Sequence, residues 1–240
     1  KQVLVSIYNP DTKKRWEEIV KPISKGTQNE LLYQRWIKHN EEVVDSLSNG
    51  TLGYVHIRSM GDASYRDVYA DILGKYNRRK GIVIDTRFNG GGRLHEDIEI
   101  LFSGEKYLEQ VIRDSVACVM PSRRYVKPSI MIMCEANYSN AHGTPWVYKH
   151  KKMGKLVGMP VPGTMSSVTW ETLQDTDLYF GLPIVGYRTQ EGYYLENSQL
   201  EPDIKVRNTP EKLAVGIDEQ LEAAVKELMK DVENYDYWGK

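Results

Sequence analysis

A strand, a sharp turn and a helix are encoded in residues 130–146, which read Ile130-Met-Ile-Met-Cys-Glu-Ala-Asn-Tyr-Ser-Asn-Ala-His-Gly-Thr-Pro-Trp146. The continuous apolar start is typical of a strand that is buried on both faces. The turn brings Ser139 to the start of the helix, beside backbone N–H groups that have no partner within the helix. Such a turn can present a nucleophile, because free N–H groups can stabilise a developing oxyanion. The structural alternative is that Ser139 caps the helix.

Two further segments fit the same arrangement. Upstream, Ile84-Asp-Thr-Arg-Phe-Asn-Gly-Gly-Gly92 ends an apolar strand in a glycine turn, and downstream lies Leu195-Glu-Asn-Ser-Gln-Leu-Glu-Pro-Asp203. Glycines allow a backbone N–H to approach another group closely. Taken alone, the glycine turn would be an ordinary connection between a strand and a helix. It lacks the GxGxxG spacing and the terminal Lys-Ser/Thr of a phosphate loop, which disfavours nucleotide binding.

The spacing of apolar residues predicts strands that alternate with helices, which indicates an α/β fold with a mostly parallel sheet. A β-hairpin is predicted over residues 1–23, and a β-rich stretch over 160–207 with hairpin-like runs at 177–180, 183–188 and 192–196. The expected core strands are 53–58, 81–86, 129–134 and 155–159. The expected helices are 28–47, 64–76, 94–103, 140–152 and 214–232.

Bulk composition narrows the function classes. The chain has 240 residues, enough for one large α/β domain or a domain with a small appendage. Its formal charge of −1 gives no electrostatic footprint for nucleic acid or an anionic membrane. No apolar run approaches the about 20 residues of a membrane-spanning helix. The chain begins with Lys1 instead of Met, so we expect it to belong to a longer protein, and the compartment is not determined.

The two cysteines indicate neither a disulfide framework nor a metal site. Cys118 and Cys134 are too few and too far apart for a disulfide framework or a zinc site. We expect both to be small buried residues, with a single bridge between them as the alternative.

The glycine turn, the serine turn and the Glu-Asn…Pro-Asp segment, in this order, resemble the catalytic core of the tricorn-like and C-terminal processing (tail-specific) serine peptidases. The resemblance covers roughly residues 50–232, including Gly53-Tyr-Val-His-Ile57 and Gly216-Ile-Asp-Glu-Gln-Leu221. The Glu196-Asn197 pair and the β-rich insert are closer to the tricorn branch. The resemblance implies a crotonase/ClpP-like layered ββα core with a mostly parallel sheet, a β-rich insert and an N-terminal hairpin.

The resemblance also implies a division of the chain. Residues 26–232 would form the catalytic core and residues 233–240 a C-terminal tail. Residues 1–25 would be either the end of a preceding PDZ domain or a hairpin of the core itself. The implied partners are a peptide or unfolded polypeptide substrate and the upstream PDZ and helical domains of the same protein, and a homo-oligomer is compatible with them. Neither a nucleic acid, nor a metal, nor an organic cofactor is implied.

Site residues carry over position by position. Ser139 corresponds to the nucleophile, and Glu196 to the carboxylate that helps to position the catalytic apparatus. The backbone amides of Gly92 and Asn140 would form the oxyanion hole, and Gly91 would line the cleft. Asp85 and Arg87 also fit the family's pattern, although a buried ion pair is the favoured interpretation for them. Residues 105–128 are expected to contribute to substrate selection, but their mixed charges indicate no preference.

The catalytic base is not evident. In the tricorn branch a Ser-His pair upstream of the PDZ domain supplies it, and none of the five histidines here follows a serine. His95 and His142 lie within a few residues of the two turns, so both are candidate cleft-lining residues. The lysines Lys149, Lys151 and Lys152 lie too far along the helix for the Ser/Lys dyad of the processing peptidases. We therefore expect the catalytic histidine upstream of this fragment and little activity from the fragment alone.

The function predicted is that of a serine peptidase core that hydrolyses peptide bonds through an acyl-enzyme on Ser139. The main alternative is a catalytically silent peptide-binding module that keeps the cleft but has no base. A crotonase-like acyl-CoA enzyme is a weaker alternative, because the serine turn and the Glu196-Asn197 pair do not favour it.

Overall fold

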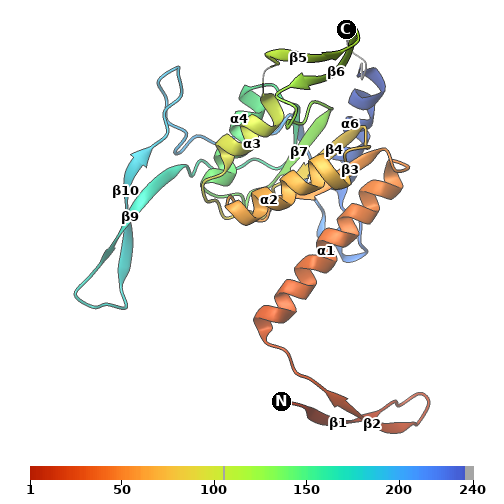
Figure 1. Cartoon of the computed structure of the whole chain (residues 1–240). Helices are drawn as coiled ribbons and strands as arrows, with labels where there is room; N and C mark the ends of the chain where they lie inside the picture. Colours follow the sequence, from red (N-terminus) through yellow and green to blue (C-terminus); the bar gives the residue numbers. More distant parts are fainter. Residues whose placement is uncertain (105, 236–240) are drawn as a thin grey trace. The chain divides into compact units, whose positions relative to one another are not determined.

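The computed structural model describes residues 1–104 and 106–235, and it divides into a unit of Lys1–His39 and a unit that begins at Asn40. In the first unit, β1 (Val3–Tyr8) pairs with β2 (Arg15–Val20) in antiparallel register, which confirms the predicted hairpin (Figure 1). Asn9 Oδ1 accepts hydrogen bonds from the Asp11 and Thr12 amides and so stabilises the turn.

Helix α1 (Lys25–Leu47) starts three residues before the predicted position. Ser24 accepts a hydrogen bond from the Thr27 amide at its start, so this serine caps the helix. Within the second unit, buried Asn40 donates from its side chain to the Tyr54 hydroxyl, 3.0 Å away.

The second unit is built on a five-stranded sheet with the strand order β11-β8-β7-β4-β3, in which all neighbours are parallel. Its strands are β3 (Leu52–His56), β4 (Gly81–Asp85), β7 (Ser129–Met133), β8 (Lys155–Gly158) and β11 (Ile204–Lys205). Every residue of β4 and β7 is buried, as their continuous apolar sequences predict. The mostly parallel α/β fold is confirmed.

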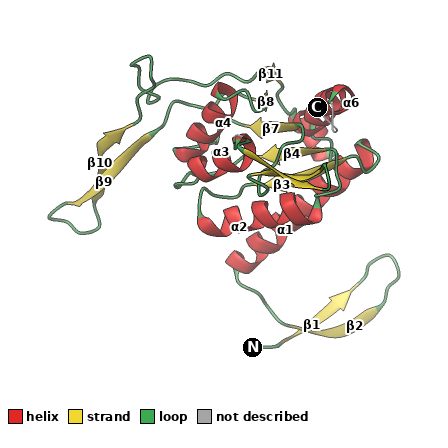
Figure 2. Ribbon diagram, turned by 45° about the horizontal axis from the view of Figure 1, so that its top comes forward, coloured by secondary structure: helices red, strands yellow, loops and turns green. Residues whose placement is uncertain are grey.

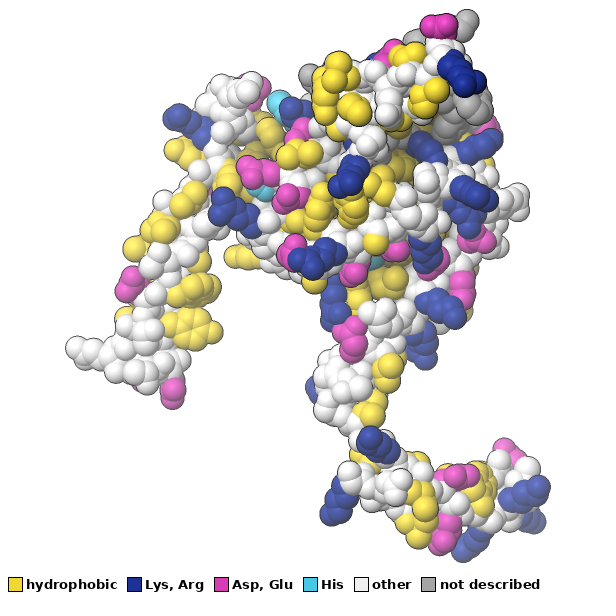
Figure 3. Space-filling view, in the orientation of Figure 1, with side chains coloured by type: hydrophobic (Ala, Val, Ile, Leu, Met, Phe, Trp, Pro, Cys, Tyr) yellow, Lys and Arg dark blue, Asp and Glu magenta, His cyan; other side chains and the backbone are white. Residues whose placement is uncertain are grey.

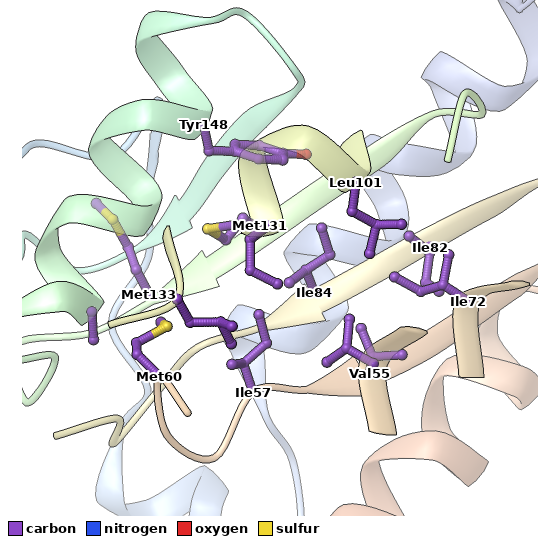
Figure 4. Packing of buried hydrophobic residues seen from close by; sticks show 14 of the residues in the cluster. Val55, Ile57, Met60, Ile72, Ile82, Ile84, Leu101, Met131, Met133 and Tyr148 are labelled. Carbon is purple, nitrogen blue, oxygen red and sulfur yellow. The ribbon is translucent and has the colours of Figure 1, made fainter. Parts of the chain in front are cut away.

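Helices cover both faces of this sheet (Figure 2). One face packs against α2 (Asp62–Ala70), α3 (His95–Ser103) and α4 (Asn140–His150), and the other against α6 (Glu219–Asn234). Alternate residues of each strand serve the two faces. Ile82, Ile84, Met131 and Met133 enter the larger core, which Figure 4 shows beside Leu101 and Tyr148.

Several element boundaries differ from the sequence prediction. The helix expected over 64–76 is α2 followed by one π-helical turn, η1 (Asp71–Lys75). The closing helix expected over 214–232 is α6, which begins five residues later, at Glu219, and a separate short helix, α5 (Pro210–Ala214), precedes it. Gly216 separates them with a φ of +83°, and Asp218 caps α6 by accepting from the Leu221 amide. The expected tail, 233–240, lies partly in α6, and residues 236–240 lie outside the described part of the chain.

The β-rich insert is simpler than predicted. Strands β9 (Ser166–Thr172) and β10 (Tyr179–Gly186) form one long antiparallel hairpin, so the runs at 177–180 and 183–188 belong to a single strand. The run at 192–196 contributes only an isolated bridge between Arg188 and Tyr194. A second hairpin, β5 (Leu108–Ile112) with β6 (Ser115–Met120), was not predicted.

Both cysteines are free thiols. Cys134 is buried as expected, but Cys118 is only half-buried because it lies on the exposed β5–β6 hairpin. In the described residues, no helix has the length and apolar character needed to cross a membrane.

Candidate active site

Ser139 occupies the turn between β7 and α4 with an unusual backbone. Its φ of +55° and ψ of −123° place a non-glycine residue in the left-handed half of conformational space, which costs about 1–3 kcal/mol. Its side chain makes no capping hydrogen bond, and its hydroxyl has no hydrogen-bond partner among the described residues. The interpretation of Ser139 as an ordinary helix cap is therefore wrong. Ser139 is half-buried, and its hydroxyl makes no hydrogen bond that would stabilise the turn or the helix.

The serine turn is packed directly against the glycine turn. A Cβ atom at Gly91 would lie 2.7 Å from Ser139 Cβ and 2.8 Å from the Tyr138 carbonyl oxygen. The Tyr138 amide in turn donates to the Asn89 carbonyl oxygen at 3.0 Å. Only glycine fits at Gly91, which also has a φ of +96°. Segments that lie far apart in the sequence thus form one compact site.

The conformation of the glycine turn leaves the Gly92 amide without a partner among the described residues. Asn89 Oδ1 accepts from the Gly91 amide at 2.9 Å. Met60 donates its own amide to Gly91 O at 3.0 Å and accepts from the Arg93 amide at 2.6 Å. Gly92, between these two, makes no hydrogen bond through its amide within the described residues, and the Asn140 amide at the start of α4 makes none either. Both groups are donors of the kind that an oxyanion requires.

The side chain of Asn140 connects the start of α4 to the start of α3. Its Oδ1 accepts from the amides of Leu94 and His95, at 2.8 and 3.0 Å, at the start of α3. Its Nδ2 lies 2.7 Å from Nδ1 of His95, and this ring nitrogen therefore accepts the bond. The half-buried His95 ring is also edge-on to Tyr187, with the ring centroids 6.3 Å apart. Hydrogen bonds to Asn140 thus hold His95 at the site.

Glu196 lies close to the same turn. Its Oε2 accepts from the Met165 amide at 2.7 Å, and the preceding residue, Thr164, accepts from the Ser139 amide at 3.4 Å through its hydroxyl. The Asn197 amide donates to Gly163 O at 2.7 Å. The short segment 163–165 therefore joins Ser139 on one side to Glu196 on the other.

Thr164 and Met165 are site residues that the sequence did not reveal. The Met165 side chain packs on Gly143, where a Cβ would lie 2.5 Å from the methionine methyl carbon. Gly143 belongs to the first turns of α4, which begins directly after Ser139. No pattern in residues 163–165 indicates these contacts, because they depend on how the insert leaves β8.

His142 lies on the first turn of α4, and its amide donates to Ser139 O at 2.8 Å. The residue has 0% exposure, and neither Nδ1 nor Nε2 has a hydrogen-bond partner in the part of the chain that the structure describes. Burial lowers the pKa of the ring, and the nearby negative charge of Glu196 opposes that shift. His142 is therefore a neutral imidazole inside the protein, next to the serine turn. The prediction that it lines the cleft is wrong for this structure, because the residue is completely buried.

A buried ion pair fixes the end of β4 just before the glycine turn. Arg87 Nη2 lies 2.7 Å from Asp85 Oδ2, and Nη1 lies 2.7 Å from Asp218 Oδ2 at the start of α6. The Tyr54 hydroxyl also donates to Asp85 at 2.9 Å. Burial alone would raise the pKa of the Asp85 carboxyl, but the Arg87 guanidinium lowers it below its ordinary value. The structural interpretation of Asp85 and Arg87 is confirmed.

Comparison with known proteins finds one peptidase family profile and several similar proteins, named as proteases or protease homologs. The sequence profile of Peptidase family S41 matches residues 51–206. The Tricorn protease of Thermoplasma volcanium is 27% identical over 215 residues, which cover 85% of this chain and 20% of that protein. A Tricorn protease homolog of Saccharolobus solfataricus is 24% identical over 212 residues, which cover 84% of this chain and 19% of that protein. The chain thus spans about a fifth of the length of these relatives.

Solved structures share the fold. A crystal structure of the tricorn protease superposes with a TM-score of 0.74 at 22% identity and covers 92% of this chain and 22% of that chain. The photosystem II D1 C-terminal processing protease superposes with a TM-score of 0.50 at 19% identity and covers 74% of this chain and 46% of that chain.

Proposed function

Because the chain belongs to Peptidase family S41, we propose that it is the core of a tricorn-like serine peptidase that hydrolyses peptide bonds through an acyl-enzyme on Ser139. The observation that carries this proposal is the backbone of Ser139. A strained φ of +55° and a hydroxyl without a partner serve no structural purpose that the described residues reveal. Strain of this kind is retained where the surrounding structure over-determines it, typically at functional sites.

The proposed reaction follows from the groups around this hydroxyl. Ser139 Oγ attacks the carbonyl carbon of the scissile peptide bond and loses its proton to a base. The negative charge that develops on the carbonyl oxygen is stabilised by the free amides of Gly92 and Asn140. The base returns the proton to the leaving amine, and water then releases the acyl group from Ser139.

Glu196 is proposed to position the catalytic apparatus and not to react itself. Its Oε2 is held by the Met165 amide, so its carboxylate has a defined place beside the serine turn. The Thr164 hydroxyl accepts from the Ser139 amide, and the next residue, Met165, binds Glu196, so this segment connects the two residues.

The base is proposed to be a histidine that lies outside residues 1–240, in an upstream part of a longer protein. His95 is hydrogen-bonded to Asn140, and the buried His142 ring makes no hydrogen bond to Ser139. A peptide or unfolded polypeptide is the proposed substrate, and upstream PDZ and helical domains are the proposed partners within the same protein.

Hydrolysis of fluorogenic peptides by the longer protein that contains this chain tests the proposal. Ser139→Ala should lower turnover by roughly 10⁴-fold or more, because the nucleophile is lost. Ser46→Ala is the matched control, since Ser46 is exposed on α1 and should leave turnover unchanged. Equal turnover by the Ser139→Ala variant and the parent protein would refute the assignment.

A catalytically silent peptide-binding module is the second candidate, favoured by one observation. No histidine among the described residues is hydrogen-bonded to the Ser139 hydroxyl. Saturable peptide binding without turnover in any longer form of the protein would support this alternative.

A further inference from the structure

The His142 ring is a buried polar group whose hydrogen-bonding capacity is not satisfied by the described residues. A neutral imidazole carries one N–H donor and one acceptor nitrogen, and here both lie in the interior without a partner among residues 1–104 and 106–235. An unsatisfied buried donor destabilises the folded state, because it gives up its hydrogen bonds to water without replacing them. A phenylalanine or leucine would fill the same space without this cost. The presence of an imidazole there points to a partner that is engaged in a working state of the site.

Glu196 offers the complementary group. One carboxylate oxygen, Oε2, is bonded to the Met165 amide, whereas Oε1 has no partner among the described residues. Met165 links the two residues, because its amide binds Glu196 and its side chain packs on Gly143, the residue after His142. The negative charge of Glu196 also acts on the His142 ring. A free acceptor thus lies near a free donor, and both adjoin the turn that carries Ser139.

We propose that His142 is a positioning residue for the peptidase reaction, whose neutral ring donates a hydrogen bond to Oε1 of Glu196 and so fixes that carboxylate. This inference rests on the proposed function of Ser139 and Glu196. A change of rotamer at Glu196, or one buried water between the groups, completes the bond. Hydrogen bonds in active sites are often long without substrate and tighten in the complex.

The position of His142 explains why a carboxylate would need this second contact. A single hydrogen bond to Oε2 leaves the carboxylate free to turn about that oxygen. A second bond, to Oε1, fixes the plane of the carboxylate relative to α4. Because His142 also binds the Ser139 carbonyl through its amide, the same residue ties Glu196 to the serine turn.

The first test measures the contact itself, by NMR of the imidazole nitrogens of His142 in the 240-residue chain. The ring should be a single neutral tautomer at neutral pH. Glu196→Gln removes the negative charge that favours protonation, so the titration midpoint of His142 should fall by about one unit or more. Glu201→Gln is the matched control on the same segment, and it should leave the midpoint in place. A midpoint that does not respond to Glu196→Gln overturns the inference.

The second test measures the role, with peptide hydrolysis by the longer protein. His142→Phe keeps the ring size but removes the donor, and it should lower kcat by about 10- to 100-fold with little change in KM. His142→Gln retains an N–H donor and should recover most of the loss. His150→Phe, on the exposed face of the same helix, should have no effect.

A double-mutant cycle separates positioning from packing. If His142 acts through Glu196, His142→Phe should cause no further loss in a Glu196→Gln background. Losses that multiply in the double variant overturn the inference, and so does a His142→Gln variant as inactive as Ser139→Ala, which would make His142 the base. Absence of Ser139-dependent turnover in every form refutes the proposed function instead, and the NMR titration still reports the contact separately.

Discussion

Backbone strain marks the site at the scale of single residues. Each of its three segments contains a non-glycine residue with a positive φ: Phe88 at +63°, Ser139 at +55° and Asn197 at +59°. The glycine turn adds Gly91 and Gly92, with φ values of +96° and +140°. Such conformations are expected where a fold holds reacting groups in a fixed geometry, because strain persists only when many contacts oppose its release.

Gly91→Ala should impair both stability and catalysis. The new Cβ would lie 2.7 Å from Ser139 Cβ, and the backbone would keep a φ that alanine disfavours. We expect a loss of about 2–4 kcal/mol in the free energy of unfolding, measured by urea denaturation, and a large loss of peptide hydrolysis. Gly90→Ala is the matched control, because nothing lies within 4 Å of its Cβ position. Equal effects of the two substitutions would contradict the proposed packing of the two turns.

Between elements, the ion pair of Arg87 connects the end of β4 to the start of α6. It joins two segments that are far apart in sequence and satisfies Asp85, which has 0% exposure. The same strand end leads directly into the glycine turn. We therefore expect the position of the proposed oxyanion donor to depend on the contact between Arg87 and Asp218 at the start of α6.

Arg87→Met should destabilise the protein by about 3–5 kcal/mol at pH 7, because it leaves the Asp85 carboxylate buried without its partner. In the parent, the pKa of Asp85 lies below its unfolded value, so its contribution is present above pH about 4 and is lost as pH falls through the folded pKa. In the variant, burial alone raises that pKa, and the penalty disappears as Asp85 takes up a proton. The difference in unfolding free energy should therefore be larger at pH 7 than near pH 4.

Denaturation at both pH values measures this difference. The matched control is Arg207→Met, which removes the exposed pair of Arg207 with Glu135 and should change stability by about 1 kcal/mol or less. A deficit for Arg87→Met that is the same at both pH values would show that lost packing, and not the charge of Asp85, is responsible.

The core elements could be predicted because their signals are local. The apolar runs of β4 and β7 and the turns that follow them are continuous in sequence, and Ser139, Gly91 and Gly92 lie in those turns. The long hairpin β9–β10 was harder to predict, because its strands carry exposed apolar residues and show no clear alternation of apolar and polar residues. Thr164 and His142 acquire their places only through tertiary contacts, which no spacing in the sequence encodes.

At the scale of the whole molecule, the insert exposes much apolar surface. Trp170, Phe180, Leu182 and Ile184 on the β9–β10 hairpin are each 47–64% exposed (Figure 3). An isolated two-stranded hairpin is at best marginally stable in water, and such surface is usually covered in an assembly. A homo-oligomer therefore stays a prediction, and the exposed apolar surface of this hairpin is the physical reason for it.

In the proposed reaction the catalytic base lies outside residues 1–240. The 240-residue chain alone should have little or no peptidase activity, because a serine hydroxyl without a base is a weak nucleophile at neutral pH. The proposed oxyanion donors and substrate binding together would still leave roughly 10³–10⁴-fold acceleration over water, so trace turnover should remain. Hydrolysis of the same fluorogenic peptides by the isolated chain and by the longer protein, each with and without Ser139→Ala, measures the difference. Strong turnover by the isolated chain that is lost in Ser139→Ala would place the base within residues 1–240, and His95 and His142 would then be the first residues to replace.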